Sequence, residues 1–189
     1  MNTEVKVVIT SKILGMTYVV PYSHGVGLQF YIERGVRTQK PVVYQVPCYE
    51  VRIEGAGRYR AVRFGLQNNG QMPPARSRLC DAGLSAAHDC IPSWVPTYSP
   101  HSFAGGSRRG AWCLLPGRSF LIHEGADTRA SQVGGSLGCV EILDGGWNSF
   151  LAEIERLGCA SCSGIGASGK LKVRVEAATF PLATLVPTP

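Results

Sequence analysis

The segment Phe120–Asp144 reads FLIHEGADTRASQVGGSLGCVEILD, and its pattern is the main indication of the fold. Apolar residues lead into His123, a loop of small and polar residues follows, and a second apolar run begins directly after Cys139. This pattern predicts one strand that ends at His123 and another that follows Cys139. The sequence therefore places a histidine and a cysteine at the two ends of one loop.

This pair of residue types is typical of nucleophilic catalysis. A cysteine becomes a nucleophile when a nearby base or positive charge produces its thiolate. Histidine is the usual base, because it titrates near neutral pH. Gly138 allows a tight turn that brings backbone N–H groups close to a developing oxyanion. We predict that Cys139 is the nucleophile and His123 the base, with Gly138 and Ser136 shaping the oxyanion site and supporting the turn.

Outward from this segment the chain is rich in short strand patterns separated by turn residues. They occur throughout the first third and again at 111–115, 119–123 and 171–177. One helix is predicted over residues 147–157, where apolar residues recur at helical spacing. We therefore expect a mainly β, single-domain protein of β-sandwich type over residues 1–180, with one helix after the catalytic strand. Residues 181–189 are expected to form a tail.

Residues 67–111 are predicted to be a long loop insert, because prolines and glycines interrupt every pattern there. A short helix is expected within the insert near residues 81–88. Cys80 and Cys90 bracket this part and could form a disulfide bond. The chain has seven cysteines, which leaves two interpretations open. One is a nucleophile with three disulfides outside the cytosol, and the other is seven reduced thiols.

The chain lacks an apolar stretch of the ~18 residues needed to span a bilayer, so no membrane span is predicted. Its first residues do not form a secretory signal pattern. We therefore expect export without a Sec signal, or alternatively a cytoplasmic location. The formal net charge of +6 suits an anionic partner such as cell-wall material.

The residues around Cys139 resemble the catalytic domain of the L,D-transpeptidase family. In that family a strand ends in histidine, and a loop leads to [Ser/Thr]-His-Gly-Cys and an apolar residue. The residues that match this motif are His123, Ser136, Gly138, Cys139 and Val140. The resemblance covers about residues 111–177 and implies the L,D-transpeptidase fold without a cofactor. It also implies that a backbone carbonyl just after His123 orients the imidazole.

Two positions depart from the family motif. The second histidine of the family is Leu137 here, and the usual Arg or Asn two residues after the cysteine is Glu141. A carboxylate at Glu141 would raise the pKa of Cys139, and Arg129 in the loop could compensate and contact substrate. The departures indicate a divergent branch, which resembles the antibacterial peptidoglycan-targeting effectors of type VI secretion.

The resemblance implies cysteine-dependent acyl transfer on peptidoglycan stem peptides. The thioester would be resolved by water, by a D-amino acid or by an amine of another stem, giving L,D-carboxypeptidase, exchange or L,D-transpeptidase activity. Such an effector would act as a toxin in the periplasm of a target bacterium, with an immunity protein and a secretion apparatus as partners. Two other functions remain open. One is a different cysteine hydrolase, such as an effector protease, and the other is a non-catalytic cell-wall-binding or phage-structural module with a decayed site.

Several weaker patterns are interpreted as structural. Cys159 and Cys162 form a CxxC pair without a second half-site at standard zinc spacing, so no metal site is predicted. The glycine-rich segment 164–170 resembles a P-loop, but it follows a predicted helix and precedes a strand, so we expect a flexible loop. Arginines that alternate with apolar residues predict a solvated sheet face and not a nucleic-acid surface. These arginines are Arg52, Arg58, Arg60 and Arg63.

Overall fold

A computed structural model describes residues 4–21, 31–33, 36–38, 43–67, 77–98, 108–115, 118–130 and 134–186. The strands are β1 (Val5–Val19), β2 (Tyr31–Glu33), β3 (Val36–Thr38), β4 (Val43–Ile53), β5 (Arg58–Val62), β6 (Phe64–Gly65), β7 (Ser77–Leu79), β8 (Ala82–Gly83), β9 (His88–Cys90), β10 (Ser93–Val95), β11 (Ala111–Leu115), β12 (Arg118–Glu124), β13 (Val140–Ile142), β14 (Leu171–Val175) and β15 (Leu182–Val186). The helices are η1 (Thr128–Ala130), α1 (Trp147–Gly158) and α2 (Cys162–Ser168).

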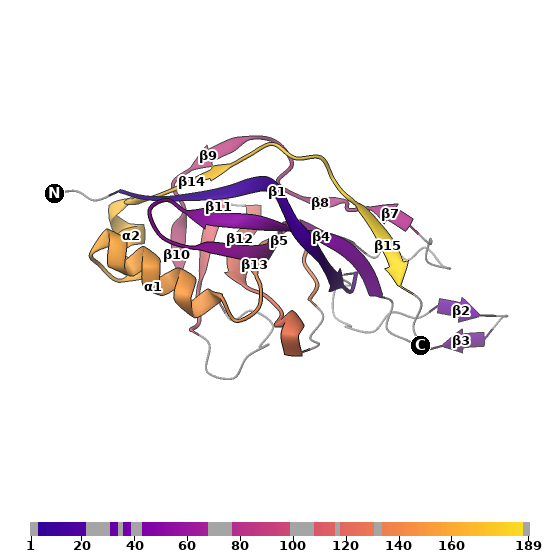
Figure 1. The fold of residues 1–189 in the computed structure, drawn as a ribbon. Coiled ribbons are helices and arrows are strands. Elements are labelled where there is room, and N and C mark those ends of the chain that lie inside the picture. The colour runs from indigo at the N-terminus through magenta and orange to yellow at the C-terminus, as the bar shows by residue number, and fades with distance from the viewer. Residues whose placement is uncertain are drawn as a thin grey trace.

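Most of the described strands belong to one curled, mixed sheet (Figure 1). Its order is β10-β11-β12-β13-β5-β4-β1-β14-β9, and β15 joins β4 to β7. The pairs β1/β14 and β12/β13 are parallel, whereas the other pairs in this sheet are antiparallel. Two smaller pairs, β2/β3 and β6/β8, lie outside the main sheet. The candidate strands β12 and β13 therefore lie within the sheet and not at its edge.

The main core lies between the helices and the sheet. In α1 the apolar residues Trp147, Phe150, Leu151 and Ile154 are fully buried, as their helical spacing predicts. They pack with alternate residues of β14 and the first half of β1. A second cluster includes Val46, Cys48, Val62 and Phe64, on the side of the sheet where β15 pairs with β4. Together these clusters hold β13 between two packed regions.

The predicted mainly β class is confirmed, but the predicted β-sandwich is not. The described strands form one curled sheet with small added pairs, and two α-helices follow β13 where one was predicted. The prediction of a flexible loop over 164–170 is wrong for residues 164–168, which lie in α2. The Ser161 side chain caps this helix by accepting a hydrogen bond from the Gly164 N–H. Ile165 fixes the helix by packing into the main core.

The predicted insert and tail also contain regular structure. Within the described part of 67–111 the chain forms the short strands β7 to β10, and β8 and β9 replace the helix expected near 81–88. Residues 182–186, expected in a tail, form β15, which pairs with β4 and β7. Both differences arise because these strands are held by partners distant in sequence, which local patterns do not reveal.

Arg63 corrects the expectation of a solvated arginine face. Its side chain is 0% exposed, and its guanidinium donates hydrogen bonds to the backbone carbonyls of Thr10, Leu84 and Glu176. The same group lies 5.1 Å from the centre of the Phe64 ring. Arg63 therefore ties three distant chain segments together. By contrast, Arg58 is mostly exposed, in agreement with the expectation.

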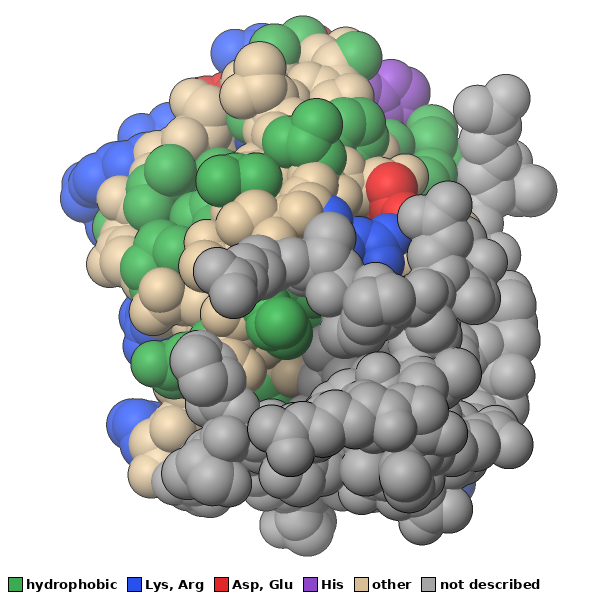
Figure 2. Space-filling model, turned by 90° about the vertical axis from the view of Figure 1, so that its right-hand side faces the viewer, with side chains coloured by type: hydrophobic (Ala, Val, Ile, Leu, Met, Phe, Trp, Pro, Cys, Tyr) green, Lys and Arg blue, Asp and Glu red, His purple; other side chains and the backbone are tan. Residues whose placement is uncertain are grey.

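Exposed apolar side chains occur in β1, β7 and β15. The largest are Ile13, Leu14, Met16, Tyr18, Leu79 and Leu182. Leu79 and Leu182 are register partners, so they lie side by side at the surface. Figure 2 shows one face of the molecule, on which hydrophobic side chains are interspersed with uncharged polar side chains and backbone. Among the described helices, none is long and apolar enough to cross a membrane.

Candidate active site

The structure places His123 and Cys139 on the same face of two neighbouring strands. His123 is the penultimate residue of β12, and it is the register partner of Glu141 in the parallel strand β13. Cys139 directly precedes β13, two residues before Glu141, and side chains two residues apart in a strand share a face. With the usual strand spacing the two Cα atoms lie about 8 Å apart on a diagonal. The predicted nucleophile and base are thus brought together.

Both residues border a small apolar cluster. Cys139 is 8% exposed and packs with Ala111 and Leu121. Tyr98 packs against this cluster, and its ring centre lies 5.2 Å from that of His123. Tyr98 therefore contacts the surroundings of both residues. The predictions from sequence did not include it, because it lies in the part interpreted as a loop insert.

The imidazole of His123 has a defined orientation. Its Nδ1 lies 2.6 Å from the backbone oxygen of Glu124. A carbonyl oxygen can only accept a hydrogen bond, so Nδ1 carries the proton, and Nε2 is the basic nitrogen of the neutral ring. The expected carbonyl just after His123 is therefore present, and it leaves Nε2 as the ring nitrogen able to accept a proton.

Ser136 holds the turn that precedes the cysteine. Its hydroxyl accepts a hydrogen bond from the Gly138 N–H at 2.9 Å and donates one to the Cys139 carbonyl at 3.0 Å. Gly138 has a φ of +103°, and a Cβ there would lie within 2.5 Å of the Gly83 nitrogen. Only glycine fits this backbone and this close approach. Because the Gly138 N–H is bonded to Ser136, the contribution of Gly138 to an oxyanion site would be the shape of the turn.

We expect Ser136→Ala to loosen this turn and lower activity about tenfold. Two buried hydrogen bonds are lost, each worth about 1 kcal/mol, and the Cys139 carbonyl loses this donor. Urea unfolding and the turnover number at saturating substrate would measure both effects. Ser149→Ala, at an exposed position of α1, is the matched control. A variant with full stability and full activity would contradict the role given to Ser136.

The surroundings of Cys139 disfavour a preformed thiolate. The pKa of the Cys139 thiol is raised to about 11, mainly by burial and to a lesser extent by the nearby Glu141 and Cys113, while a hydrogen bond with the Leu121 backbone lowers it. At pH 7 only about one thiol in ten thousand is then ionised. Deprotonation would have to accompany any attack by this sulfur, so chemistry at Cys139 would require a base close to it.

Glu141, two residues after Cys139, places a buried carboxyl group in the site. Its side chain is 0% exposed, and neither carboxyl oxygen has a hydrogen-bond partner within the described part of the chain. Burial raises the pKa of Glu141 to about 8. Glu141 therefore influences Cys139 in the direction predicted from the sequence. The sequence did not indicate its complete burial, because a lone glutamate in a short strand usually faces solvent.

Arg129 has other partners than the cysteine. It lies exposed in η1, where its guanidinium contacts Asp127 at 3.2 Å and donates to the Asp144 carbonyl. It is not among the groups that shift the pKa of Cys139, so the expected compensation does not operate in this arrangement. The Asp144 carboxylate also binds Arg60 at 2.6 Å and accepts from Thr128. These contacts fix the loop that follows His123.

Two glycines that were not predicted from the sequence, Gly65 and Gly83, let the turn before Cys139 approach β6 and β8. A Cβ at Gly65 would overlap the Ser136 carbonyl oxygen, and a Cβ at Gly138 would lie 2.5 Å from the Gly83 nitrogen. These contacts show that part of the predicted insert supports the turn. The Phe64–Gly65 pair gave no signal in the sequence, since a single glycine in a strand pattern has several explanations.

The cysteines form no disulfide bonds in the structure. All seven are free thiols, so Cys80 and Cys90 are not joined. In the described residues, no group of three or more His, Cys, Asp or Glu side chains is arranged to hold a metal ion. Cys159 is exposed and Cys162 is buried, which separates the two members of the CxxC pair.

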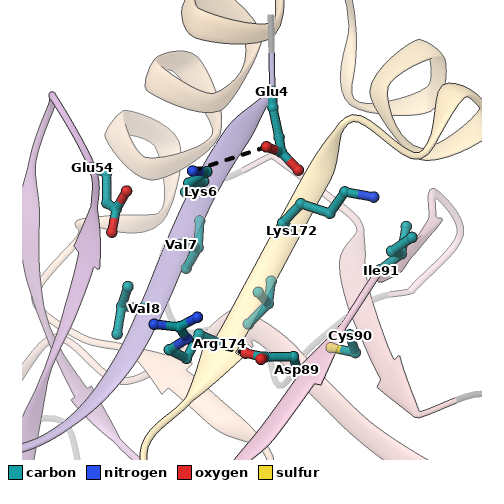
Figure 3. A pocket seen from close by; sticks show the side chains of 11 residues that line it. Glu4, Lys6, Val7, Val8, Glu54, Asp89, Cys90, Ile91, Lys172 and Arg174 are labelled. Atoms are coloured by element: carbon teal, nitrogen blue, oxygen red, sulfur yellow. Dashed lines mark hydrogen bonds and ion pairs between the residues drawn. The ribbon is translucent and has the colours of Figure 1, made fainter.

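A shallow groove of about 450 Å³ lies elsewhere, on the outer face of β1, β14 and β9 (Figure 3). Four of its charged side chains form two ion pairs, Lys6 with Glu4 at 4.0 Å and Arg174 with Asp89 at 3.2 Å, and Glu54 and Lys172 also line it. None of the predicted site residues lines this groove. The groove is therefore separate from the Cys139 site.

The chain was compared with protein-family models, curated proteins and solved structures. No protein-family model, no curated protein and no solved structure matches this chain.

Proposed function

We propose that this protein is a cysteine-dependent acyl transferase or hydrolase that acts on peptidoglycan stem peptides. The observation that carries the proposal is the pairing of Cys139 with the oriented imidazole of His123 on one face of β12 and β13. The choice of substrate rests on the resemblance of the residues around Cys139 to the L,D-transpeptidase family. We also propose the L,D-transpeptidase-type fold on this basis.

In the first half of the reaction, His123 Nε2 removes the proton from Cys139 as the sulfur attacks. The electrophile is the carbonyl carbon of the diaminopimelate residue in a stem tetrapeptide. The tetrahedral intermediate collapses, the bond to the terminal D-alanine breaks, and the imidazolium returns its proton to the leaving amine. Cys139 then carries the acyl group as a thioester.

In the second half, an acceptor resolves the thioester. His123 removes a proton from water, from a D-amino acid or from the amine of another stem, and the acceptor displaces the sulfur. The products are a shortened stem, an exchanged stem or a cross-link. The turn held by Ser136 keeps the sulfur in place through both halves.

We further propose that the protein is an exported antibacterial effector that acts in the periplasm of a target bacterium. The resemblance of its divergent motif to type VI secretion effectors supports this proposal. An immunity protein and a secretion apparatus are its proposed partners. The net charge of +6 favours binding to anionic cell-wall polymers.

Mass spectrometry of purified muropeptides tests the proposal. Tetrapeptide-stemmed, diaminopimelate-containing muropeptides are incubated with the native protein and with Cys139→Ala, with and without an added D-amino acid. Loss of the terminal D-alanine identifies water as the acceptor, and a mass shift to the added amino acid identifies exchange. Unchanged muropeptides together with a Cys139 that reacts with an alkylating agent would redirect the search to another cysteine hydrolase.

We expect His123→Gln to lower kcat/KM about 10²- to 10⁴-fold at pH 7, because the general base is lost. The deficit should shrink as the pH rises toward 11, since Cys139 then ionises directly. Initial rates between pH 6 and 10 would measure it. His88→Gln, on β9, is the matched control. A deficit that is constant across this pH range would mean that His123 only supports the structure.

A second function is favoured by the electrostatics of the site. The raised pKa of Cys139 and the buried Glu141 also fit a binding module whose catalytic site has decayed. Such a module would bind isolated cell-wall sacculi without changing them. Sedimentation of native protein with sacculi, combined with unchanged muropeptides and an unreactive Cys139, would support this alternative.

A further inference from the structure

Glu141 is a buried carboxyl group that no contact in the described residues explains. Its side chain is fully inaccessible, and neither oxygen has a hydrogen-bond partner there. Burying an unpaired polar group costs free energy, so such groups in native proteins call for an explanation, and a catalytic role is one. Glu141 is also two residues from Cys139 and next to His123 across the strand pair.

The groups that surround Glu141 leave its charge uncompensated. On its face of the sheet, β12 presents His123, and Cys139 lies directly before β13. On β5 the register partner is the apolar Val62. Gly125 and Gly134 cover the side chain: Cβ atoms built on them would lie 2.7 Å from the Glu141 Cβ and 3.0 Å from its Oε2.

The nearest arginine along β5 is engaged elsewhere. Arg60 donates to the Asp144 carboxylate at 2.6 Å and to the Cys48 sulfur at 3.3 Å. Glu124 belongs to β12, but its register partner is Ile142, so its side chain faces the opposite side of the sheet. Burial alone accounts for the raised pKa of Glu141. Charge at Glu141 would therefore be felt mainly by Cys139 and His123.

We propose that Glu141 is a positioning residue that controls the ionisation of Cys139, permitting thiolate formation while its carboxyl is protonated and opposing it once the carboxyl is ionised. This inference rests on the proposed function only in taking Cys139 as the nucleophile. It holds for any acyl substrate. It also assigns a role to the departure at Glu141, where the family motif carries Arg or Asn.

The sign of the effect follows from the order of the two titrations. Glu141 titrates near pH 8, before Cys139, which titrates near pH 11. Below about pH 7 the carboxyl is neutral and does not repel a sulfur anion. Above pH 8 it is negative, and the thiolate has to form beside a like charge. The site would therefore work best in neutral or mildly acidic surroundings.

Site-resolved alkylation tests the inference without any substrate. Native protein, Glu141→Gln and Glu141→Met are pulsed with iodoacetamide between pH 6 and 10, and modification of the Cys139 peptide is quantified by mass spectrometry. Glu50→Gln is the control, because it removes a buried carboxyl from β4, which β5 separates from β13 in the sheet order. The exposed Cys159 is the internal reference thiol.

We expect the variant-to-native rate ratio at Cys139 to be near one at pH 6–7 and to reach about three- to tenfold by pH 9.5, since one pKa unit is a tenfold change in thiolate. Glu50→Gln should stay near one throughout. A ratio that is independent of pH would overturn the inference, because a purely structural effect acts at every pH.

A stability measurement covers the case in which the variants pack poorly. The pKa of Glu141 is higher in the folded protein than in the unfolded chain, so the native protein should lose stability as the pH rises from about 4.5 to 8. In Glu141→Gln this loss of stability should be smaller, by the amount that the titration of one carboxyl group contributes. Equal pH dependence of the urea midpoints would show that folding does not raise the pKa of Glu141 and would also overturn the inference. Muropeptide turnover is scored separately, so failure of the proposed function is distinguishable from failure of this inference.

Discussion

Cys139→Ala is expected to abolish D-alanine release and exchange on stem tetrapeptides. The sulfur is the only atom of this side chain that can form the thioester, and removing a nucleophile from a covalent mechanism costs roughly 10⁶-fold in kcat. Cys139 is buried beside Ala111 and Leu121, so alanine leaves a small apolar gap and keeps the backbone of the turn. We therefore expect a folded protein without activity. Chromatography of muropeptides with mass detection would measure the loss.

Cys159→Ala provides the matched control. It removes an exposed cysteine at the end of α1, so the activity of this variant should equal that of the native protein. Cys139→Ser adds a stricter test, since serine retains the shape but is a poor nucleophile beside histidine alone. Residual turnover in Cys139→Ala above one part in a thousand would assign the chemistry to another residue.

Arg63→Met is expected to destabilise the protein by about 3–5 kcal/mol, because it leaves three buried backbone carbonyls without their donor. Methionine has similar length and fills the space, but it cannot donate hydrogen bonds. The carbonyls of Thr10, Leu84 and Glu176 would all lose their arginine donor. Each buried carbonyl left unpaired costs about 1–3 kcal/mol. These segments come from β1, from the chain between β8 and β9, and from the end of β14, so several contacts would loosen together.

Urea unfolding monitored by circular dichroism would measure this change. Arg156→Met, at an exposed position of α1, controls for the loss of a positive charge and should change stability by less than about 0.5 kcal/mol. Arg63→Lys should recover only part of the loss, because one ammonium group cannot reach three carbonyls in separate directions. Equal stability of Arg63→Met and the native protein would mean that solvent satisfies these carbonyls.

Local patterns were sufficient where a segment carries its own signal. In β14 the alternation of Leu171, Val173 and Val175 with charged residues predicted a strand with one buried face. The helical spacing of apolar residues predicted α1 to within one residue at its end. A strand that follows Cys139 was also predicted correctly, and the strand predicted over 119–123 extends by one residue at each end.

Local patterns failed where distant partners decide the structure. In α2, a serine cap and the burial of Ile165 overcome the low helix propensity of its glycines. Residues 182–186 form a strand only because β4 and β7 offer free edges. Arg63 and Glu141 are buried against the general preference of charged residues for solvent. For the site, the pairing of His123 with Cys139 was predicted, whereas the contacts of Tyr98 and Gly65 depend on tertiary packing.

The order of the main sheet has a consequence for how molecules of this protein meet one another. The path begins at β10 and ends at β9, which are consecutive strands of three residues each, separated only by Ile91 and Pro92. Unpaired strand edges are templates for intermolecular aggregation, and short edges interrupted by proline are poor templates. Among the described strands, β1 is paired on both sides only over Val5–Ile9, where it lies between β14 and β4, whereas Ile13–Tyr18 pair with β4 alone. The second part of β1, which carries the exposed side chains of Ile13, Leu14, Met16 and Tyr18, is therefore the edge of this sheet where a strand from another copy would find free backbone.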